Sequence, residues 1–509
     1  MMQFDTMPQL NIPYSHTIST GEQCRETDRR TIEEFGIDGF TLMETAGMQA
    51  AYFIGENEDR GATGLYFCGK GNNGGDALVI ARYLAIQQNH TCHVCFPAGS
   101  GDLTVDAHRN LELLLKLKTQ NLSIHIYESD NEIPELSPDY IIDGLLGTGL
   151  TSNLRSPFDA TVGLINSQKS RIYALDIPTG LHSDTGELMP EAIRADYTLS
   201  FGALKPGFYL DQGPDTTGTI HHFNLSFPAH CRETFAELVS VELAHWLPPI
   251  KRKAEHKYSD RLLYIVAGSE GLTGAAIMAA ASGWKTGVGA VVLISPKGLL
   301  EIYEKNLPDI IKSPVGKSGD TSFRDQHAKE TAKILDQKKG VLLIGPGLGR
   351  EKSTFSFVKQ LLANFNGPVV IDADALQVLP DLDKPDKANW IITPHPGEAA
   401  HLSGTAFERA YDRLTWAAGY ASKKNVTVVS KGNPTFIGTP DGNNYLTGYD
   451  TRIFARAGFG DVLAGAIAGN LAICKNSELS IIRALLDGYI KATRLIHQEE
   501  KPLEPKDLL

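Results

Sequence analysis

The sequence lacks the features of secreted, membrane-spanning and nucleic-acid-binding proteins. It has only 6 cysteines in 509 residues, too few for a disulfide framework. No apolar run reaches the ~18 residues that a membrane-spanning helix needs, and no signal peptide is visible. Acidic residues outnumber basic ones by 60 to 48, and the net charge of −12 argues against nucleic acid and anionic membranes as partners. These absences predict a cytoplasmic protein. Cys92 and Cys95 form a CxxC pair, but no second Cys/His pair lies nearby, so we favour reduced thiols over a zinc or redox site.

The rest of the composition is that of a globular protein with many glycines. The chain is 42% hydrophobic and 21% charged, close to the average for folded domains. Its 49 glycines exceed the usual share of ~7%, and many of them are clustered. The length suggests two large domains or three smaller ones.

Short apolar strands alternate with amphipathic helices, which predicts an α/β protein built around parallel sheets. This rhythm breaks over Thr234–Tyr258, where Trp246-Leu-Pro-Pro-Ile250 precedes a polar run. We therefore predict two different domains, at residues 1–245 and 250–509. The predicted strands include 91–96, 140–143, 171–176, 197–201, 262–267, 290–295, 341–344, 369–372, 390–393 and 426–430, and the predicted helices include 77–88, 106–118, 273–285, 460–474 and 478–498.

Three loops in the first half each follow a predicted strand. Gly69–Asp76 contains G-x-G-x-x-G before a helix, where backbone N–H groups can approach a phosphate. Asp143–Gly149 and Asp176–Gly180 each begin with a carboxylate that could act as a base or hold a cation. Taken singly, each loop is also explained as a turn or a helix cap. The second strand ends in Cys95-Phe-Pro97 without the acid that would hold a ribose, which disfavours an ordinary dinucleotide-dependent dehydrogenase.

Together these loops resemble the NAD(P)H-hydrate epimerase family over about residues 20–230. The shared motifs are Asn72–Asp76, Asp143–Gly149, Asp176–Gly180 and Gly202–Gly207. The resemblance implies a Rossmann-like three-layer domain that interconverts the R and S epimers of hydrated NADH or NADPH beside a potassium ion.

The resemblance also implies roles for particular residues. Asp176 would be the catalytic acid–base group at the reacting carbon. The potassium ligands would be Asn73, Asp143 and Thr179. With Asp176, the substrate would contact Asn72, Asn73, Gly74, Gly75, Asp76, Gly147, Thr148, Gly149, Leu150, Thr151, Ser152 and Asn153.

In the second half, Gly458-Phe-Gly-Asp461 opens a predicted helix. Backbone N–H groups at a helix N-terminus can bind an anion, and the adjacent carboxylate can accept a hydroxyl proton, which suits phosphoryl transfer. An N-capped helix explains this motif equally well by itself. Four more loops follow predicted strands in this half, and the series favours a ligand site: Gly345–Gly349, Asp372–Asp374, Thr393–Glu398 and Lys431-Gly432.

These loops resemble the ribokinase-like fold and, within it, the nucleotide-dependent NAD(P)H-hydrate dehydratases, over about residues 255–500. The resemblance implies that ADP or ATP, with Mg²⁺, phosphorylates the 6-hydroxyl of the S hydrate, and that loss of phosphate restores the reduced cofactor. Asp461 would be the catalytic base. The substrate would also contact Ala276, Gly349 and His395, and the nucleotide would contact Lys431, Gly432, Asn433, Pro434, Thr435 and Gly460. By itself His395 could also be a structural histidine.

The sequence departs from the dehydratase pattern just before Asp461. Gly448-Tyr-Asp450 stands where the family usually has Asn-Pro-Gly, and Ala457 and Phe459 stand among the small or hydroxyl residues of the anion loop. Phe459 removes a hydroxyl group, and we expect its ring to add bulk beside the path of the phosphate.

We therefore predict a bifunctional repair enzyme that acts on the hydrates NADHX and NADPHX with an adenine nucleotide, and we expect it to form homo-oligomers. One alternative is a ribokinase-type kinase for a small molecule such as a vitamin, with a regulatory Rossmann-like domain. The other is a nucleotide-sensing or scaffold protein without catalysis. A stable phosphorylated product would favour the kinase, whereas recovery of reduced nicotinamide absorbance would favour repair.

Overall fold

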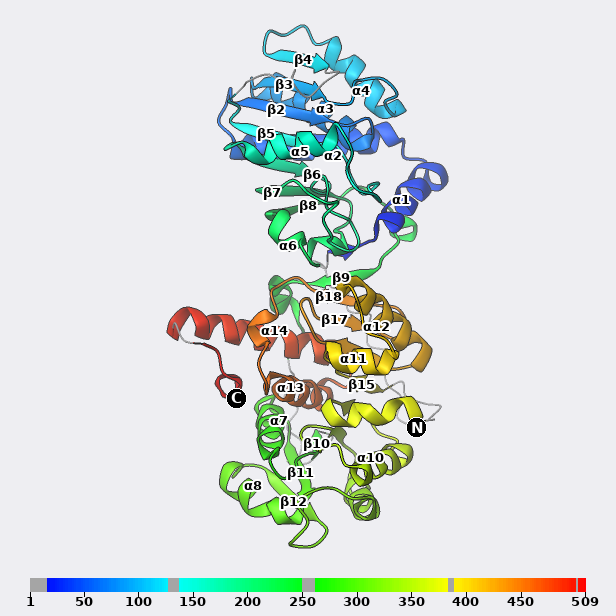
Figure 1. Ribbon diagram of the computed structural model, residues 1–509, viewed down its shortest axis with the longest axis vertical. Helices are drawn as coiled ribbons and strands as arrows, with labels where there is room; N and C mark the ends of the chain where they lie inside the picture. The colour runs from blue at the N-terminus through cyan, green and yellow to red at the C-terminus, as the bar shows by residue number, and fades with distance from the viewer. Residues whose placement is uncertain (1–15, 127–136, 250–260, 383–388, 500–501) are drawn as a thin grey trace. The chain divides into compact units, whose positions relative to one another are not determined.

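The computed structural model describes residues 16–126, 137–249, 261–382, 389–499 and 502–509 (Figure 1). Packing divides these residues into two compact units. The N-terminal unit comprises His16–Ala236 with Arg409–Tyr411, and the C-terminal unit comprises Glu237–Glu408 and Asp412–Leu509. Within the described ranges, no helix is both long and apolar enough to cross a membrane.

The N-terminal unit is built on a parallel sheet in the order β4-β3-β2-β5-β6-β7-β8. The chain runs outward from β2 to β4, returns to the middle at β5, and then runs outward the other way. The order therefore reverses between β2 and β5, and open α/β sheets bind ligands at such a switch point. The strands are β2 (Thr63–Cys68), β3 (Thr91–Phe96), β4 (Leu122–Ile126), β5 (Tyr140–Gly144), β6 (Arg171–Leu175), β7 (Tyr197–Phe201) and β8 (Thr219–Phe223).

Helices cover both faces of this sheet, which confirms the predicted three-layer α/β arrangement (Figure 1). Because side chains alternate along a strand, Tyr66 and Leu65 on β2 enter different cores. Tyr66 packs with residues of α2, α3 and α4, and Leu65 packs with residues of α5. The helices are α1 (Gly21–Arg30), α2 (Gly39–Asn57), α3 (Asn72–Gln87), α4 (Val105–Leu115), α5 (Phe158–Ser167) and α6 (Gly213–Thr216).

The C-terminal unit has a mixed sheet whose order from β9 is β9-β18-β17-β16-β15-β14-β13-β10-β11-β12. The strands from β12 across to β16 are parallel to their neighbours, and the pairs β16–β17 and β17–β18 are antiparallel. A turn at Asp441-Gly442 joins β17 to β18. The strands are β9 (Ala236–Val239), β10 (Leu262–Val266), β11 (Ala290–Pro296), β12 (Ile311–Val315), β13 (Val341–Ile344), β14 (Val369–Ile371), β15 (Trp390–Ile392), β16 (Thr427–Ser430), β17 (Phe436–Gly438) and β18 (Tyr445–Thr447).

Two glycines allow α7 and α13 to pack closely in this unit. A Cβ on Gly465 would lie 2.2 Å from the Ala279 carbonyl oxygen, and one on Gly469 would lie 2.8 Å from that of Gly283. This contact holds α13 in place, and Asp461 lies in the first turn of that helix. The helices of the unit are α7 (Thr273–Lys285), α8 (Leu300–Asn306), α9 (Ala328–Leu335), α10 (Lys352–Asn364), α11 (Pro396–Ser403), α12 (Ala410–Lys424), α13 (Phe459–Cys474) and α14 (Ser477–Glu499).

The packing places the start of the C-terminal unit before the domain change that the sequence predicts between residues 245 and 250. Glu237, Leu238 and Val239 pair with β18, and Val239 and Leu243 lie in the core of the C-terminal unit. By packing, that unit therefore begins at Glu237. Residues 250–260, which hold most of the predicted polar linker, lie outside the described residues.

Candidate active sites

The N-terminal unit contains a cavity of about 600 Å³ at the switch point between β2 and β5. The loop after β2, the loop after β5 and Asp176 after β6 all reach it, as the sequence predicts. The predicted ligand residues that line it are Asn72, Asn73, Asp76, Gly147, Thr148, Gly149, Leu150, Thr151, Ser152 and Asp176. Gly74 and Gly75 are buried and do not line the cavity, and Asn153 is exposed outside its wall.

Close packing of the loops accounts for two of the three glycines in G-x-G-x-x-G. A Cβ on Gly69 would lie 1.7 Å from the Leu145 carbonyl oxygen, and one on Gly74 would lie 2.0 Å from the Gly69 carbonyl oxygen. A Cβ on Gly71 would meet nothing within 4 Å. Gly69 and Gly74 thus hold the first two loops together, while Gly71 leaves space at the N-terminus of α3.

Asp176 lies at the end of β6 in a left-handed backbone conformation with φ of 62°. Such a conformation is costly for a non-glycine residue and is common at functional sites. Its carboxylate accepts a hydrogen bond from Lys205 Nζ, which also donates to Ser200 Oγ at 3.1 Å. The Lys205 side chain is only 1% exposed. The cavity wall therefore carries a buried ion pair whose lysine the sequence analysis missed, although Lys205 is the one charged residue of the Gly202–Gly207 motif.

Two more carboxyl groups face this cavity. Asp28 on α1 and Asp76 on α3 both line it, and sequence reasoning missed Asp28. Burial raises the pKa of Asp28 to about 6, and the negative charge of Asp176 adds to the effect. Burial likewise raises the pKa of Asp76 well above its usual value, with further contributions from Asp176 and Asp28. The cavity thus combines one carboxylate paired with a lysine and two carboxyl groups whose pKa values are raised.

The predicted metal ligands form a buried set of oxygen atoms beneath the cavity. Asp143 accepts hydrogen bonds from the Thr179 N–H at 2.8 Å and the Thr179 hydroxyl at 2.7 Å, and burial raises its pKa to about 6. Both polar side-chain atoms of Asn73 are buried without a hydrogen-bond partner. A buried carboxylate and an orphaned amide oxygen are ligands of the kind that a hard cation binds. Within the described residues, no group of three or more His, Cys, Asp or Glu side chains could hold a metal.

The C-terminal unit contains a cavity of about 920 Å³ beside the N-terminus of α13. The loops after β14, β15 and β16 contribute to its wall. The predicted residues that line it are His395, Lys431, Gly432, Asn433, Thr435, Gly460 and Asp461. Pro434 and Gly349 do not line this cavity, and Ala276 is fully buried in the core.

Asp461 in the first turn of α13 faces a network of charges. Burial raises its pKa to about 7; the negative charge of Asp372 adds to this shift, and Lys431 opposes it. Lys431 Nζ donates to Asp372 Oδ1 at 2.8 Å and lies 4.0 Å from Glu398 Oε2. The Thr393 hydroxyl also donates to Asp372, at 2.6 Å. Burial and the charge of Asp372 thus outweigh the opposing charge of Lys431 at Asp461.

His395 is both a helix cap and part of the cavity wall. The Nδ1 atom of His395 accepts hydrogen bonds from the backbone N–H groups of Gly397 and Glu398 at 3.0 and 3.2 Å. The backbone N–H of His395 donates to Glu398 Oε2 at 2.8 Å. This capping box begins α11. Burial and the nearby Lys431 lower the pKa of His395, so its neutral form is favoured.

Arg413 of α12 holds the loop after β16 from behind, and the sequence analysis missed it. The side chain is buried, and it donates to the Ser430 carbonyl at 2.9 Å, the Ser430 hydroxyl at 2.7 Å and the Pro434 carbonyl at 3.0 Å. Burial lowers its pKa to about 10. A Cβ on Gly432 would lie 2.8 Å from the guanidinium, so glycine is required there. Arg413 therefore sets the shape of the loop that carries Lys431.

The Phe459 ring packs into a hydrophobic cluster. It is buried with Ala492 and Leu503, and its ring centroid lies 5.4 Å from that of Phe454. Its main contacts are thus with the C-terminal segment, although part of the residue also borders the cavity. At this position Phe459 contributes to the packing of α13 against α14 and residues 502–509.

Two known families match the chain. The family described as YjeF-related protein N-terminus matches residues 39–207, and the family described as NAD(P)H-hydrate dehydratase matches residues 263–508. The bifunctional NAD(P)H-hydrate repair enzyme of Salinibacter ruber is 34% identical over 479 residues, which cover 89% of this chain and 88% of that protein. The enzyme of the same name from Escherichia coli is 32% identical over 472 residues, which cover 92% and 87%. A solved structure of the ADP/ATP-dependent NAD(P)H-hydrate dehydratase from Bacillus subtilis, co-crystallised with ATP and Mg²⁺, is 24% identical, with a TM-score of 0.46 over 53% of this chain and 93% of that one.

Proposed function

The chain belongs to the family of bifunctional NAD(P)H-hydrate repair enzymes, and we propose that each of its two cavities carries out one of the two repair reactions. The N-terminal cavity interconverts the R and S epimers of hydrated NADH and NADPH. The C-terminal cavity dehydrates the S epimer at the expense of ADP or ATP. The observation that carries this proposal is the placement of two acids. Asp176 lies at the wall of the cavity in the N-terminal unit, and Asp461 lies at the wall of the cavity in the C-terminal unit.

In the N-terminal cavity, Asp176 acts as the acid–base group at the carbon that bears the hydroxyl. The buried Lys205 fixes the carboxylate, and the left-handed backbone directs it towards the cavity. Asn72, Asn73 and the loop Gly147–Ser152 hold the phosphates and ribose of the hydrate. A potassium ion would be held by Asn73, Asp143 and Thr179. The side-chain amide of Asn73, which has no hydrogen-bond partner among the described residues, supports this assignment. When bound, this ion supplies positive charge beside an anionic substrate.

In the C-terminal cavity, Asp461 accepts the proton of the 6-hydroxyl as that oxygen attacks the terminal phosphate of the nucleotide. A base with a pKa of about 7 is half ionised at neutral pH and suits this transfer. The N–H groups that begin α13 and the charge of Lys431 stabilise the transferring phosphoryl group. Elimination of phosphate then restores the nicotinamide double bond, while His395 helps to hold the hydrate.

Magnesium enters this half with the nucleotide. Asp372 is occupied by Lys431 and Thr393, and Asp374 accepts hydrogen bonds from the Gly349 N–H at 3.0 Å and from Arg350 Nε at 3.1 Å. Because Mg²⁺ usually keeps waters and binds through substrate phosphates, these residues fit an ion carried by ADP or ATP. Bound in this way, the ion would neutralise phosphate charge.

The test uses the full chain with a mixture of hydrate epimers and each nucleotide. Asp176→Asn should stop epimer exchange and leave dehydration of the S epimer unchanged, and Asp461→Asn should do the reverse. Replacing potassium by sodium should slow exchange alone. Nicotinamide absorbance and epimer ratio are followed together. A stable phosphorylated product without recovery of absorbance would support the kinase alternative, and loss of both activities in either variant would refute two independent sites.

The size of the assembly stays a prediction. We propose that the chain forms homo-oligomers, and sedimentation of the purified protein would test this directly.

A further inference from the structure

Asp28 is an acidic side chain in the N-terminal cavity without a polar partner. Among the residues that the structure describes, none donates a hydrogen bond or forms a salt bridge to its carboxylate. The two arginines that follow it bind elsewhere. Arg29 pairs with Glu26, Glu33 and Glu34, and Arg30 pairs with Glu34 and Glu233. Asp28 is thus left facing the same cavity as Asp176.

Several contacts fix the helix that carries Asp28. The Thr20 side chain and Gln23 form a capping box at the start of α1. The Gly21 N–H donates to Asp184 Oδ1 at 2.7 Å, and the Thr27 hydroxyl accepts from the Glu233 N–H at 3.0 Å. These bonds join the start of α1 to Asp184 and its end to Glu233, which lines the cavity. Asp28 therefore occupies a defined position on its wall.

The two carboxyl groups lie in different electrostatic surroundings. Asp176 is paired with the buried Lys205, whereas Asp28 is exposed to the open cavity, where the surrounding protein and the charge of Asp176 raise its pKa to about 6. Carboxyl pairs whose surroundings differ in this way divide the roles of acid and base in many enzymes. The ionisable side chains on α1 and around it are Glu22, Cys24, Arg25, Glu26, Arg29, Arg30, Glu33, Glu34, Asp76, Asp176, Asp184, Lys205, His230, Arg232 and Glu233.

We propose that Asp28 is a second catalytic residue of epimerisation and acts as the proton donor in the cavity where Asp176 is the base. The inference rests on the proposed function of the N-terminal cavity. The Asp28 carboxyl protonates the hydroxyl of the hydrate, the C–O bond breaks with its electron pair on oxygen, and water leaves. The lone pair of the ring nitrogen stabilises the resulting cation.

Water then returns to the other face of the ring. Its oxygen forms the new C–O bond, and the Asp176 carboxylate takes the released proton. Exchange with solvent restores the protonated Asp28 and the ionised Asp176. One proton is given and one is taken, and nothing is oxidised or reduced. The reverse reaction runs these steps backwards, with Asp176 giving the proton and Asp28 taking it.

The test is Asp28→Asn in the full chain, with epimer exchange measured from pH 5 to 8 and the uncatalysed exchange subtracted. We expect kcat to fall by about 10²–10⁴-fold, the usual contribution of a proton-transfer group, with a smaller change in KM. Because the donor must be protonated, exchange by the unchanged protein should decline as pH rises above about 6. This decline should be absent from the variant, and Asp28→Glu should recover part of the rate.

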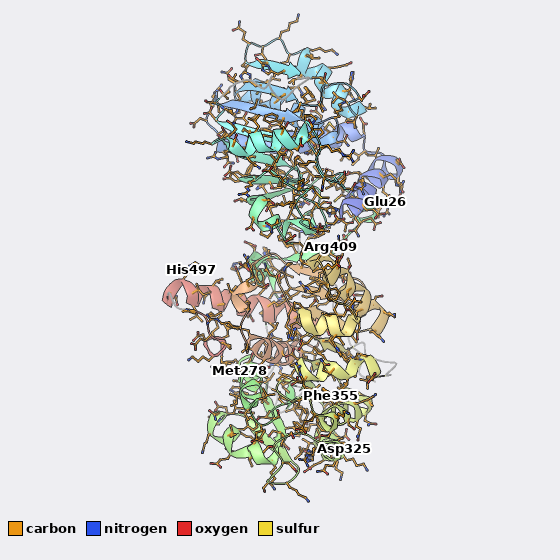
Figure 2. The ribbon with its side chains drawn as sticks, viewed as in Figure 1. Glu26, Met278, Asp325, Phe355, Arg409 and His497 are labelled. Carbon is orange, nitrogen blue, oxygen red and sulfur yellow. The ribbon has the colours of Figure 1, made fainter. Side chains whose placement is uncertain are left out.

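The matched control is Glu26→Gln on the same helix (Figure 2), since Glu26 is paired with Arg29 and does not line the cavity. It should leave exchange unchanged, and dehydration of pure S epimer should be unaffected in all three variants. An Asp28→Asn rate within twofold of the unchanged protein, or an unaltered pH profile, would overturn the role of Asp28 alone. If the unchanged protein shows no exchange, or if Asp176→Asn retains it, the proposed function of the cavity fails instead.

Discussion

The ion pair between Lys431 and Asp372 should make a large contribution to the stability of the C-terminal unit. Their side chains are 18% and 2% exposed, and Nζ lies 2.8 Å from Oδ1. At an effective dielectric constant of about 20, two unit charges at this distance attract by about 6 kcal/mol. Desolvation of both ions offsets much of this, and removal of one partner from such a pair costs about 3–5 kcal/mol.

The two single variants should differ. Among the described residues, Lys431→Met leaves the Thr393 hydroxyl as the only side-chain donor to the buried Asp372 carboxylate. We expect a loss of about 3 kcal/mol, the lower end of the range, because that hydrogen bond remains. Asp372→Asn leaves Lys431 near Glu398 at 4.0 Å and should cost less, about 1.5 kcal/mol. The double variant should be more stable than the sum of the two losses predicts, by at least about 1 kcal/mol.

Tryptophan fluorescence during urea unfolding can measure these losses in the C-terminal unit alone. All 4 tryptophans of the chain lie in that unit, at Trp246, Trp284, Trp390 and Trp416. The fluorescence transition therefore reports on that unit while the N-terminal unit contributes none of the signal. A Lys431→Met variant within about 0.5 kcal/mol of the unchanged protein, or additive losses in the double variant, would refute a strong buried ion pair.

Three further outcomes follow from the site geometry. Dehydration kcat/KM should rise with pH through about 7, because Asp461 must be ionised to act as a base; a rate independent of pH between 6 and 8 would contradict this. Arg413→Met should raise the KM for nucleotide more than it lowers kcat, and the loss of charged donors to Ser430 and Pro434 should destabilise the unit by about 2 kcal/mol, measurable by the same unfolding assay. A chain beginning at Glu237 should fold and dehydrate the S epimer, whereas one beginning at residue 250 should melt lower because it lacks β9; equal melting temperatures would show that β9 is dispensable.

Elements with strong apolar runs between glycine-rich loops could be predicted from the sequence. The strands at 91–96, 197–201 and 341–344 and the helix at 273–285 are confirmed with their predicted bounds. The strand β9 was missed because it is short and stands in a stretch rich in polar residues and proline. The helix α1 was missed because its sequence, Gly-Glu-Gln-Cys-Arg-Glu-Thr-Asp-Arg-Arg, has no apolar stripe.

The loops of both cavities were predictable for a different reason. Parallel strands end at one edge of a sheet, so glycines and carboxylates that follow several strands converge there. Residues whose role depends on burial gave no such signal. Asp28 and Arg413 lie on helices with several exposed charged residues, and their positions become informative only once tertiary packing directs one into a cavity and the other behind a loop. Phe459 shows the converse. The sequence suggested that its ring would add bulk beside the path of the phosphate, but the ring packs mainly with Phe454 and Leu503.

The two cavities each place a buried lysine near their proposed catalytic carboxylate, but they connect it differently. Lys205 binds Asp176 directly, so the charge of that carboxylate is balanced within the pair. Lys431 instead binds Asp372, and Asp461 is left with a pKa of about 7. This difference matches the proposed chemistry. A group that works in concert with a second carboxyl benefits from a fixed charge, whereas a lone base that takes a proton from a hydroxyl at neutral pH benefits from a pKa close to that pH.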